Sequence, residues 1–482
     1  MVFTSPIFLF AFLPVVLGLH FLIGKKFRNL LLFMASSVFY FYGEQKMLLL
    51  MYFVIFINYI AALGIEYVAK NDSHFRLVYK KIILVGCITI CIGLLWYFKY
   101  WNFTLHLFND VASVLGIPCK ITKFDKIVLP LGISFYTFHV LSYTIDVFIG
   151  KMKAEKNLLD FATYVLMFPQ LVAGPIVRYI DIQKQFKERT VTSLGVANGI
   201  RRFCFGMGKK ILIANIVAKT VDKIFAVDIS QIELATAWLG AICYTMQIYF
   251  DFSGYSDMAI GLAMMFGFHY KENFNYPYIS KTIGEFWRRW HISLSSWLRD
   301  YVYINMGGNR VSLLRFCINT LFVFLLSGLW HGANMTFVLW GLWYGIFIIL
   351  EKLFLKPFLC DKPWLSHFYA LFVIIFGWVL FRANTVAYAL KYWLTMLGSN
   401  GIHFGKVFEY TQNDIYAAIL LGIIFSIDWR SAYKQLVIGN KKSHNRFLAF
   451  KVFSYVVAVA IFMISLTSIM SSTYNPFIYF RF

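Results

Sequence analysis

The residues best suited to chemistry are two histidines within apolar or aromatic sequence. His331 lies in Ser327-Gly-Leu-Trp-His-Gly-Ala-Asn334, between stretches that read as membrane-buried helix. An ionisable side chain at membrane depth costs on the order of 2 to 3 kcal/mol or more, so it usually lines a bundle interior or a wet cavity. A neutral imidazole accepts a proton at physiological pH, which suits a general base for a hydroxyl nucleophile. The alternative is a structural histidine satisfied by a neighbouring carbonyl.

His291 lies in Glu285-Phe-Trp-Arg-Arg-Trp-His-Ile-Ser-Leu-Ser-Ser-Trp-Leu-Arg-Asp300, a segment whose residues repeat with a helical period. Such a helix would carry an aromatic packing stripe and a polar stripe that is too polar to face lipid. The aromatic stripe consists of Trp290, Leu294, Trp297 and Tyr301. The polar stripe consists of Arg288, His291, Ser295 and Arg299. Glu285 and Arg289 have the spacing of an i, i+4 ion pair. The guanidinium groups of Arg288 and Arg299 match the phosphates of a cofactor, although lipid phosphate or simple solvation would also satisfy them.

Polar residues also interrupt the hydrophobic pattern between Leu158 and Arg310. Asp251 and Asp257 lie in the aromatic run Met246-Gln-Ile-Tyr-Phe-Asp-Phe-Ser-Gly-Tyr-Ser-Asp257, and we expect this run to face inward. Irregular backbone at membrane depth is tolerated only inside protein or beside a water-filled cavity. Both aspartates are candidate binding residues, with structural hydrogen bonding as the alternative.

The composition predicts an integral membrane protein. Hydrophobic residues make up 60% of the 482 positions, more than a globular core could hide, and roughly eleven stretches are long and apolar enough to span a bilayer. The net charge of +22 is concentrated in clusters at every second gap between these stretches, as in cytoplasmic loops, which favours topology and lipid contact over nucleic-acid binding. The clusters are Lys25 to Arg28, Lys70 to Lys81, Lys151 to Lys156, Lys352 to Lys362 and Arg430 to Arg446. The seven cysteines form no CxxC pair, so no disulfide framework or metal site is expected.

We expect one membrane domain, residues 1–482, with N-terminal helices in 1–150, a catalytic core in 158–354 and C-terminal helices in 366–482. The first span follows no basic residue or cleavage site, so we expect it to be retained with the N-terminus outside. An outer loop is expected at Asn102 to Lys126. The predicted spans are Val2–Ile23, Leu30–Tyr42, Met47–Ala69, Ile82–Trp101, Ile127–Ile149, Leu313–Leu329, Thr336–Leu353, His367–Leu380, Ile415–Ile427 and Phe450–Met470.

Several separated motifs resemble those of the membrane-bound O-acyltransferases, and their order resembles the bacterial polysaccharide branch of that family. Two of them contain the candidate histidines, Trp290-His-Ile-Ser-Leu-Ser295 and Ser327-Gly-Leu-Trp-His-Gly-Ala-Asn334. The others are Pro169-Gln-Leu-Val-Ala-Gly-Pro-Ile-Val-Arg178, Tyr249-Phe-Asp-Phe-Ser-Gly-Tyr-Ser-Asp257, Asn273-Phe-Asn-Tyr-Pro-Tyr278, Gly307-Gly-Asn-Arg310 and Asn475-Pro-Phe-Ile-Tyr-Phe-Arg-Phe482.

This resemblance implies an all-α polytopic fold, with a ring of about 11 transmembrane helices and re-entrant or buried helices around a central funnel. It places His331 at the position of the family's main catalytic histidine and His291 at its second polar position. Trp330 and Asn334 are further candidate binding residues beside His331. The implied activity is O-acetylation of an exported polysaccharide, as in alginate biosynthesis, with acetyl-CoA as the donor substrate and no permanently bound cofactor.

The resemblance also implies a bacterial cytoplasmic (inner) membrane location and an exported acetyltransferase partner of the serine-hydrolase (SGNH) type. The chain itself has no Gly-x-Ser-x-Gly elbow, which fits such a division of labour. Two other functions stay open on the sequence alone. One is D-alanyl transfer to teichoic acid from a carrier-protein thioester, and the other, from a different class, is a polytopic transporter.

Overall fold

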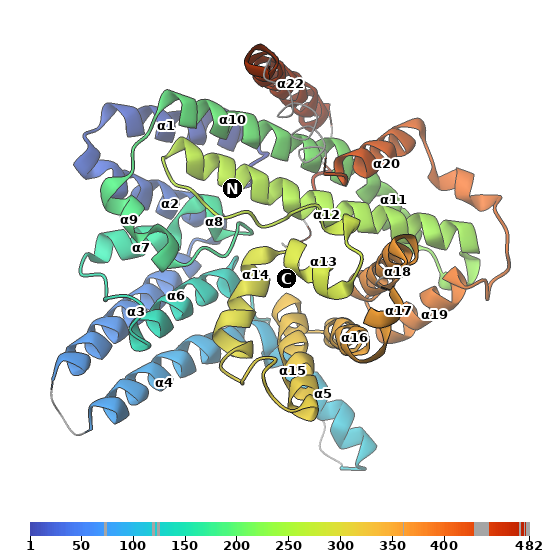
Figure 1. The fold of residues 1–482 in the computed structure, drawn as a ribbon, viewed down its shortest axis with the longest axis horizontal. Coiled ribbons are helices and arrows are strands. Elements are labelled where there is room, and N and C mark those ends of the chain that lie inside the picture. The colour runs from blue at the N-terminus through green and yellow to red at the C-terminus, as the bar shows by residue number, and fades with distance from the viewer. Residues whose placement is uncertain are drawn as a thin grey trace. The chain divides into compact units, whose positions relative to one another are not determined.

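The computed structural model describes residues 1–71, 75–117, 121–122, 126–359, 361–428, 443–471, 474–476 and 478. Most of these residues are helical, and no strand occurs among them (Figure 1). The fold is therefore all-α, as predicted. The chain divides into two compact units, Met1–Val196 with Ala263–Tyr270, and Ala197–Leu262 with Lys271–Phe482.

The first unit is built mainly from nine helices that precede residue 189. In Figure 1 the long helices α3 and α4 run side by side, and both pack against α6. Almost every residue of α6 is buried, which explains why its sequence lacks a polar face. The helices are α1 (Leu13–Leu22), α2 (Arg28–Glu44), α3 (Met47–Lys70), α4 (Arg76–Leu95), α5 (Trp101–Val114), α6 (Ile133–Phe148), α7 (Leu158–Leu166), α8 (Phe168–Leu171) and α9 (Tyr179–Glu188).

The second unit contains both candidate histidines. Its longest helix, α12 (Leu234–Met265), ends in the first unit, and two short helices, α13 (Ile283–Arg289) and α14 (Ile292–Leu298), follow it in sequence. The α15–α16 hairpin makes the most extensive helix pair in this unit. The remaining helices are α10 (Ser193–Gly208), α11 (Asn215–Ala226), α15 (Leu313–His331), α16 (Met335–Leu350), α17 (Lys356–Leu359), α18 (Pro363–Arg382), α19 (Val386–Met396), α20 (Asn413–Phe425) and α22 (Ser443–Ser471).

Among the described residues, six helical segments are long and apolar enough to cross a membrane, and two apolar helices, Phe8–Leu22 and Asn413–Phe425, are shorter. Each of the eight overlaps a predicted span. Their outward residues include many exposed large hydrophobic side chains, which only a lipid surface accommodates at such density. The six segments are Met47–Lys70, Arg76–Val114, Leu313–His331, Met335–Leu359, Pro363–Arg382 and Phe450–Ser471.

The loop predicted at Asn102 to Lys126 was wrong over its first half. The helix of α4 continues through the π-helical turn Trp96–Tyr100 into α5, which extends to Val114. Apolar residues recur along α5 and the ring centroids of Trp96 and Trp101 lie 4.9 Å apart across the junction, so the helix has packing partners that a loop would lack. The predicted span from Ile127 is helical only from Ile133, and most of the Arg430 to Arg446 cluster lies outside the described residues.

Candidate active site

His331 is the last residue of α15, and two glycines allow the helix to end there. Gly332 has an extended backbone, and a β-carbon on it would lie 2.2 Å from a ring carbon of Phe337. A β-carbon on Gly328 would lie 2.2 Å from the Phe337 carbonyl oxygen. The absence of side chains thus lets α15 and the start of α16 approach closely, and the turn between them carries the histidine.

Aromatic rings enclose the His331 imidazole, which is only 2% exposed. The ring centroids of Trp330, Trp340 and Phe381 lie 4.8, 5.0 and 5.1 Å from that of His331, each in an edge-to-face arrangement. Such an environment excludes water and strengthens any electrostatic interaction made inside it.

His291 lies in the break between α13 and α14 and is fully buried. Its backbone is left-handed, with φ of 43°, a conformation that costs a non-glycine residue about 1–3 kcal/mol. The neighbouring segment holds the break in place: the Ile292 N–H donates to the Asn273 carbonyl at 2.9 Å, and the Asn275 N–H donates to the Arg289 carbonyl at 2.9 Å. The His291 side chain is therefore held in its buried position by a strained backbone conformation that the segment around Asn273 stabilises.

The prediction of one continuous helix from Glu285 to Asp300 was wrong, because the left-handed residue His291 separates α13 from α14. The aromatic stripe is buried as predicted, and the Glu285–Arg289 ion pair is present at 2.9 Å. The polar stripe is not a single face, because the break directs His291 inward while Arg288 and Arg299 are exposed. A period in the sequence cannot reveal such a break when every residue in it is a competent helix former.

The indole of Trp330 contacts both histidines. Its ring centroid lies 5.7 Å from that of His291 and 4.8 Å from that of His331. The two imidazoles come from segments forty positions apart in the sequence, yet they share one side chain as a neighbour. The structure thus brings together the two histidines that the sequence predicted to be catalytic, His291 and His331, with Trp330 between them as a shared neighbour.

Hydrogen bonds to Asn273 hold the His291 ring. The Asn273 side chain is 1% exposed, and its Oδ1 lies 3.1 Å from His291 Nδ1. Burial lowers the pKa of His291, which lies outside the six candidate spans, to about 3, so the ring is neutral at physiological pH. The sequence contained the Asn273 motif, but no local pattern connects it with His291, and no role was predicted for it.

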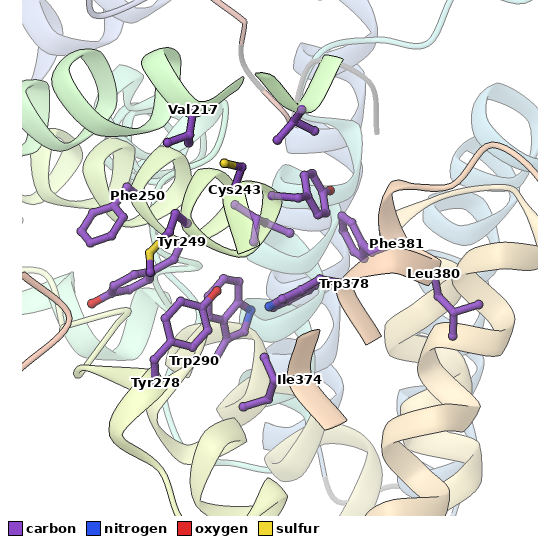
Figure 2. Packing of buried hydrophobic residues seen from close by; sticks show 14 of the residues in the cluster. Val217, Cys243, Tyr249, Phe250, Tyr278, Trp290, Ile374, Trp378, Leu380 and Phe381 are labelled. Atoms are coloured by element: carbon purple, nitrogen blue, oxygen red, sulfur yellow. The ribbon is translucent and has the colours of Figure 1, made fainter. Parts of the chain in front are cut away.

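Large aromatic side chains pack together in a buried cluster that includes Trp290, the neighbour of His291 in the chain; Figure 2 shows Trp290 with Tyr278 and Trp378 in this cluster. The indole of Trp290, next to His291, lies 4.8 Å from Trp378 and 6.1 Å from Tyr249 between ring centroids. Buried Glu351 accepts hydrogen bonds from the backbone N–H groups of Ile283 and Gly284 and so caps α13. These contacts fix the helix that leads into the histidine.

The other predicted binding residues lie in different surroundings. Asp251 Oδ1 is 2.6 Å from Lys210 Nζ in an ion pair whose side chains are each 2% exposed. Asp257 pairs with Arg202 at 2.8 Å and with Lys209 at 2.7 Å.

Asn334 caps α16 by accepting from the Thr336 N–H at 3.0 Å, and its Nδ2 donates to the Asn384 carbonyl at 3.0 Å. Arg299 is 62% exposed and pairs with Asp300. Within the described part of the chain, no three His, Cys, Asp or Glu side chains are grouped so as to hold a metal ion.

Known proteins resemble much of this sequence. Residues 152–388, which include both histidines, match the model of the membrane-bound O-acyltransferase family. The chain is 45% identical over 401 residues to the probable alginate O-acetylase of Pseudomonas aeruginosa, covering 82% of this chain and 75% of that one. It is 38% identical to the probable alginate O-acetylase of Azotobacter vinelandii over the whole of both chains, and 34% identical to the peptidoglycan O-acetyltransferase of Helicobacter pylori over 83% and 81% of the two.

Proposed function

The chain belongs to the membrane-bound O-acyltransferase family, and from this premise we propose that it relays an acetyl group from a cytoplasmic thioester, acetyl-CoA, across the membrane for O-acetylation of an exported polysaccharide. That it is a multi-pass membrane O-acyltransferase follows from the family and from the apolar helices. The relatives are named for acetylation of alginate and of peptidoglycan, which supports acetyl as the group and a polysaccharide as the acceptor.

One observation carries the proposal: two buried imidazoles, His291 and His331, contact the same indole at ring distances of 5.7 and 4.8 Å. Acyl transfer to a hydroxyl needs a group that removes the hydroxyl proton and a group that manages the second proton or the developing charge. A pair of buried imidazoles in an aromatic site can supply both functions.

In the proposed reaction a ring nitrogen of His331 takes the proton of the attacking hydroxyl. The hydroxyl oxygen forms a bond to the thioester carbonyl carbon, the carbon–sulfur bond breaks, and the departing thiolate takes up the proton. A second route proceeds through an acyl-imidazole, in which His331 attacks the thioester first and the hydroxyl then displaces the histidine. Mass analysis of protein quenched during a single turnover separates the routes, because only the second leaves an acetyl group on His331.

Burial of the histidines also supports a short acyl group. The rings of Trp330, Trp340 and Phe381 must move aside for any substrate to reach His331, and a two-carbon group requires the least displacement. We further propose that the enzyme lies in a bacterial cytoplasmic membrane with its N-terminus outside. An exported acetyltransferase of the serine-hydrolase (SGNH) type would then place the acetyl group on the polymer.

Purified protein in vesicles tests the donor and the direction of transfer. We expect radiolabelled acetyl-CoA on the cytoplasmic side to yield acetylated acceptor on the opposite side, and we expect D-alanyl carrier protein to give no product. The His331→Ala variant in matched vesicles provides the background. Transfer from the carrier protein in place of acetyl-CoA would instead identify the chain as a D-alanyl transferase, and transfer by His331→Ala at the normal rate would overturn the proposed chemistry.

A further inference from the structure

The side chain of Asn273 receives three hydrogen-bond contacts at a single oxygen. The Ser293 backbone N–H donates to Asn273 Oδ1 at 3.1 Å, the Ser293 hydroxyl donates to it at 2.9 Å, and His291 Nδ1 lies 3.1 Å away. On the other side of the amide, Asn273 Nδ2 donates to the Ser256 hydroxyl at 3.1 Å. All four groups are within the second unit, and Asn273 and His291 are both buried.

These contacts determine which end of the amide faces His291. A backbone N–H is only ever a donor, so the Asn273 atom opposite the Ser293 N–H must be the oxygen and not the NH₂ group. The amide orientation is therefore fixed by the main chain and does not depend on a choice between two similar side-chain atoms.

The orientation of Asn273 in turn fixes the proton on His291. The Ser293 hydroxyl also lies 3.4 Å from His291 Nδ1, but it donates to Asn273 Oδ1 at the shorter distance of 2.9 Å. Because the amide oxygen can only accept, His291 Nδ1 then carries the hydrogen that it donates to that oxygen. A neutral imidazole has one N–H, so its lone pair is then on Nε2. Among the residues that the structure describes, no atom hydrogen-bonds to this Nε2, which is buried. What distinguishes this nitrogen is its place: the His291 ring shares the Trp330 indole with His331, so Nε2 is positioned to accept a hydrogen bond in a reacting complex.

We infer that Asn273 is a positioning residue that holds neutral His291 with its hydrogen on Nδ1 and so presents Nε2 as a proton acceptor in acyl transfer. The inference rests on the proposed function and sharpens it. In its resting form His291 cannot donate a hydrogen bond from Nε2 to a developing oxyanion. It gains that ability only after His331 has taken the proton of the attacking hydroxyl and passed it to His291 Nε2. The departing thiolate then removes that proton from Nε2 when the carbon–sulfur bond breaks.

The charged and titratable groups around His291 do not compete for this role. On α12, Asp251 pairs with Lys210 and Asp257 pairs with Arg202 and Lys209, while on α13 Arg289 pairs with Glu285. His331, on α15, is the other titratable side chain at the shared indole. Burial accounts for the low pKa of His291. A charge introduced at position 273 would therefore be the main charge acting on the imidazole.

Substitutions at position 273 test the inference through the pH profile of kcat/KM for acetyl transfer. Asn273→Asp keeps an acceptor oxygen but adds a negative charge beside Nδ1–H, which stabilises the imidazolium and raises its pKa. We expect the acid limb of the profile to move up by at least one pH unit. Asn273→Leu, of similar size, removes the acceptor, and we expect kcat to fall about 10- to 100-fold with KM for acetyl-CoA within about two-fold.

Ser293→Ala is the matched control. It deletes the hydroxyl that donates to Asn273 Oδ1 and lies 3.4 Å from His291 Nδ1, but it keeps the Ser293 backbone N–H that orients the amide. We expect it to lower kcat by less than about three-fold and to leave the pH profile unchanged. An Asn273→Asp profile that coincides with the wild-type profile overturns the inference. So does an Asn273→Leu protein that elutes and melts like the wild type and keeps full kcat.

A second readout does not depend on catalysis. In protein labelled with ¹⁵N-histidine, the His291 resonances are identified by their loss in His291→Gln, and their shifts distinguish a protonated Nδ1 from a protonated Nε2. We expect protonated Nδ1 in the wild type; a hydrogen on Nε2 overturns the inference even if activity behaves as expected. If His331→Ala remains active, the proposed function fails while the tautomer measurement still stands, so the two failures are distinguishable.

Discussion

Two polar regions of the second unit look alike in the sequence but differ in the structure. On α12, Asp251 and Asp257 are each paired with basic side chains at 2.6 to 2.8 Å. At the shared Trp330 indole, His291 and His331 are buried among aromatic rings instead, and His291 Nε2 has no hydrogen-bond partner in the described chain. Paired charges stabilise a fold, whereas an unpaired nitrogen held in place is available for a reaction.

The largest expected effect is on the histidine side of this comparison. Replacing His331 with alanine removes the proton acceptor, and we expect kcat for acetyl transfer to fall by about 10²–10⁴-fold. The melting temperature in detergent should stay within a few degrees of the wild type, because the surrounding aromatic rings keep their packing. Transfer assays and thermal unfolding on the same preparation check both statements. A large loss of stability would place His331 with the structural groups.

Asp251 should show the opposite behaviour. Replacing it with asparagine removes the counter-ion of the buried Lys210 ammonium, which also donates to the Pro476 carbonyl. Breaking a buried ion pair destabilises a protein by about 3–5 kcal/mol. The paired substitution Lys210→Met with Asp251→Leu removes both charges, and we expect it to recover at least half of that loss. Equilibrium unfolding of the three variants measures the difference. If Asp251→Asn were as stable as the wild type but inactive, Asp251 would belong to the reaction.

Asp257 predicts a pH dependence of stability rather than of activity. Burial disfavours its charged form, but Lys209 and Arg202 outweigh that effect and lower its pKa to about 2. A carboxyl group whose pKa is lower in the folded state stabilises the fold above its unfolded pKa of about 3.9, and this contribution is lost as pH falls from about 4 to 2. We expect about 2 kcal/mol for Asp257.

Unfolding measured at pH 6 and at pH 3, for the wild type and for Asp257→Asn, checks this sign. The stability difference between the two proteins should be larger at pH 6 and should shrink at pH 3. A difference that stayed constant across this range would mean that the carboxylate of Asp257 does not titrate with folding.

The features that could be predicted from the sequence are those set by continuous stretches of residues, such as the membrane spans. Hydropathy over about twenty residues identifies a span such as Leu313–His331, because a continuous apolar segment of that length is what crossing the bilayer requires. His331 stood out for the same reason, as an imidazole in apolar surroundings with a glycine on each side. These features are local, so no knowledge of the folded chain was needed.

Other features depend on contacts between distant residues and were out of reach. The left-handed backbone at His291 is imposed by pairing with the segment around Asn273, eighteen positions earlier. The partners of Asp251 and Asp257 lie more than forty positions away along the chain, so their ion pairs have no signature in the local sequence.

The smallest expected effect concerns the exposed arginines. Arg299 is 62% exposed and its Nε lies 2.7 Å from Asp300, a pair that contributes little in water. We expect Arg299→Ala to change the free energy of unfolding by less than about 0.5 kcal/mol and KM for acetyl-CoA by less than about two-fold.

The sequence suggested phosphate contact for Arg288 and Arg299, and acetyl-CoA titrations of the single and double variants test this contact directly. A several-fold rise in KM that weakened with added salt would place these guanidinium groups on the donor's phosphates, because screened charge attraction has that dependence. The site would then extend from the buried histidines to the exposed end of α14.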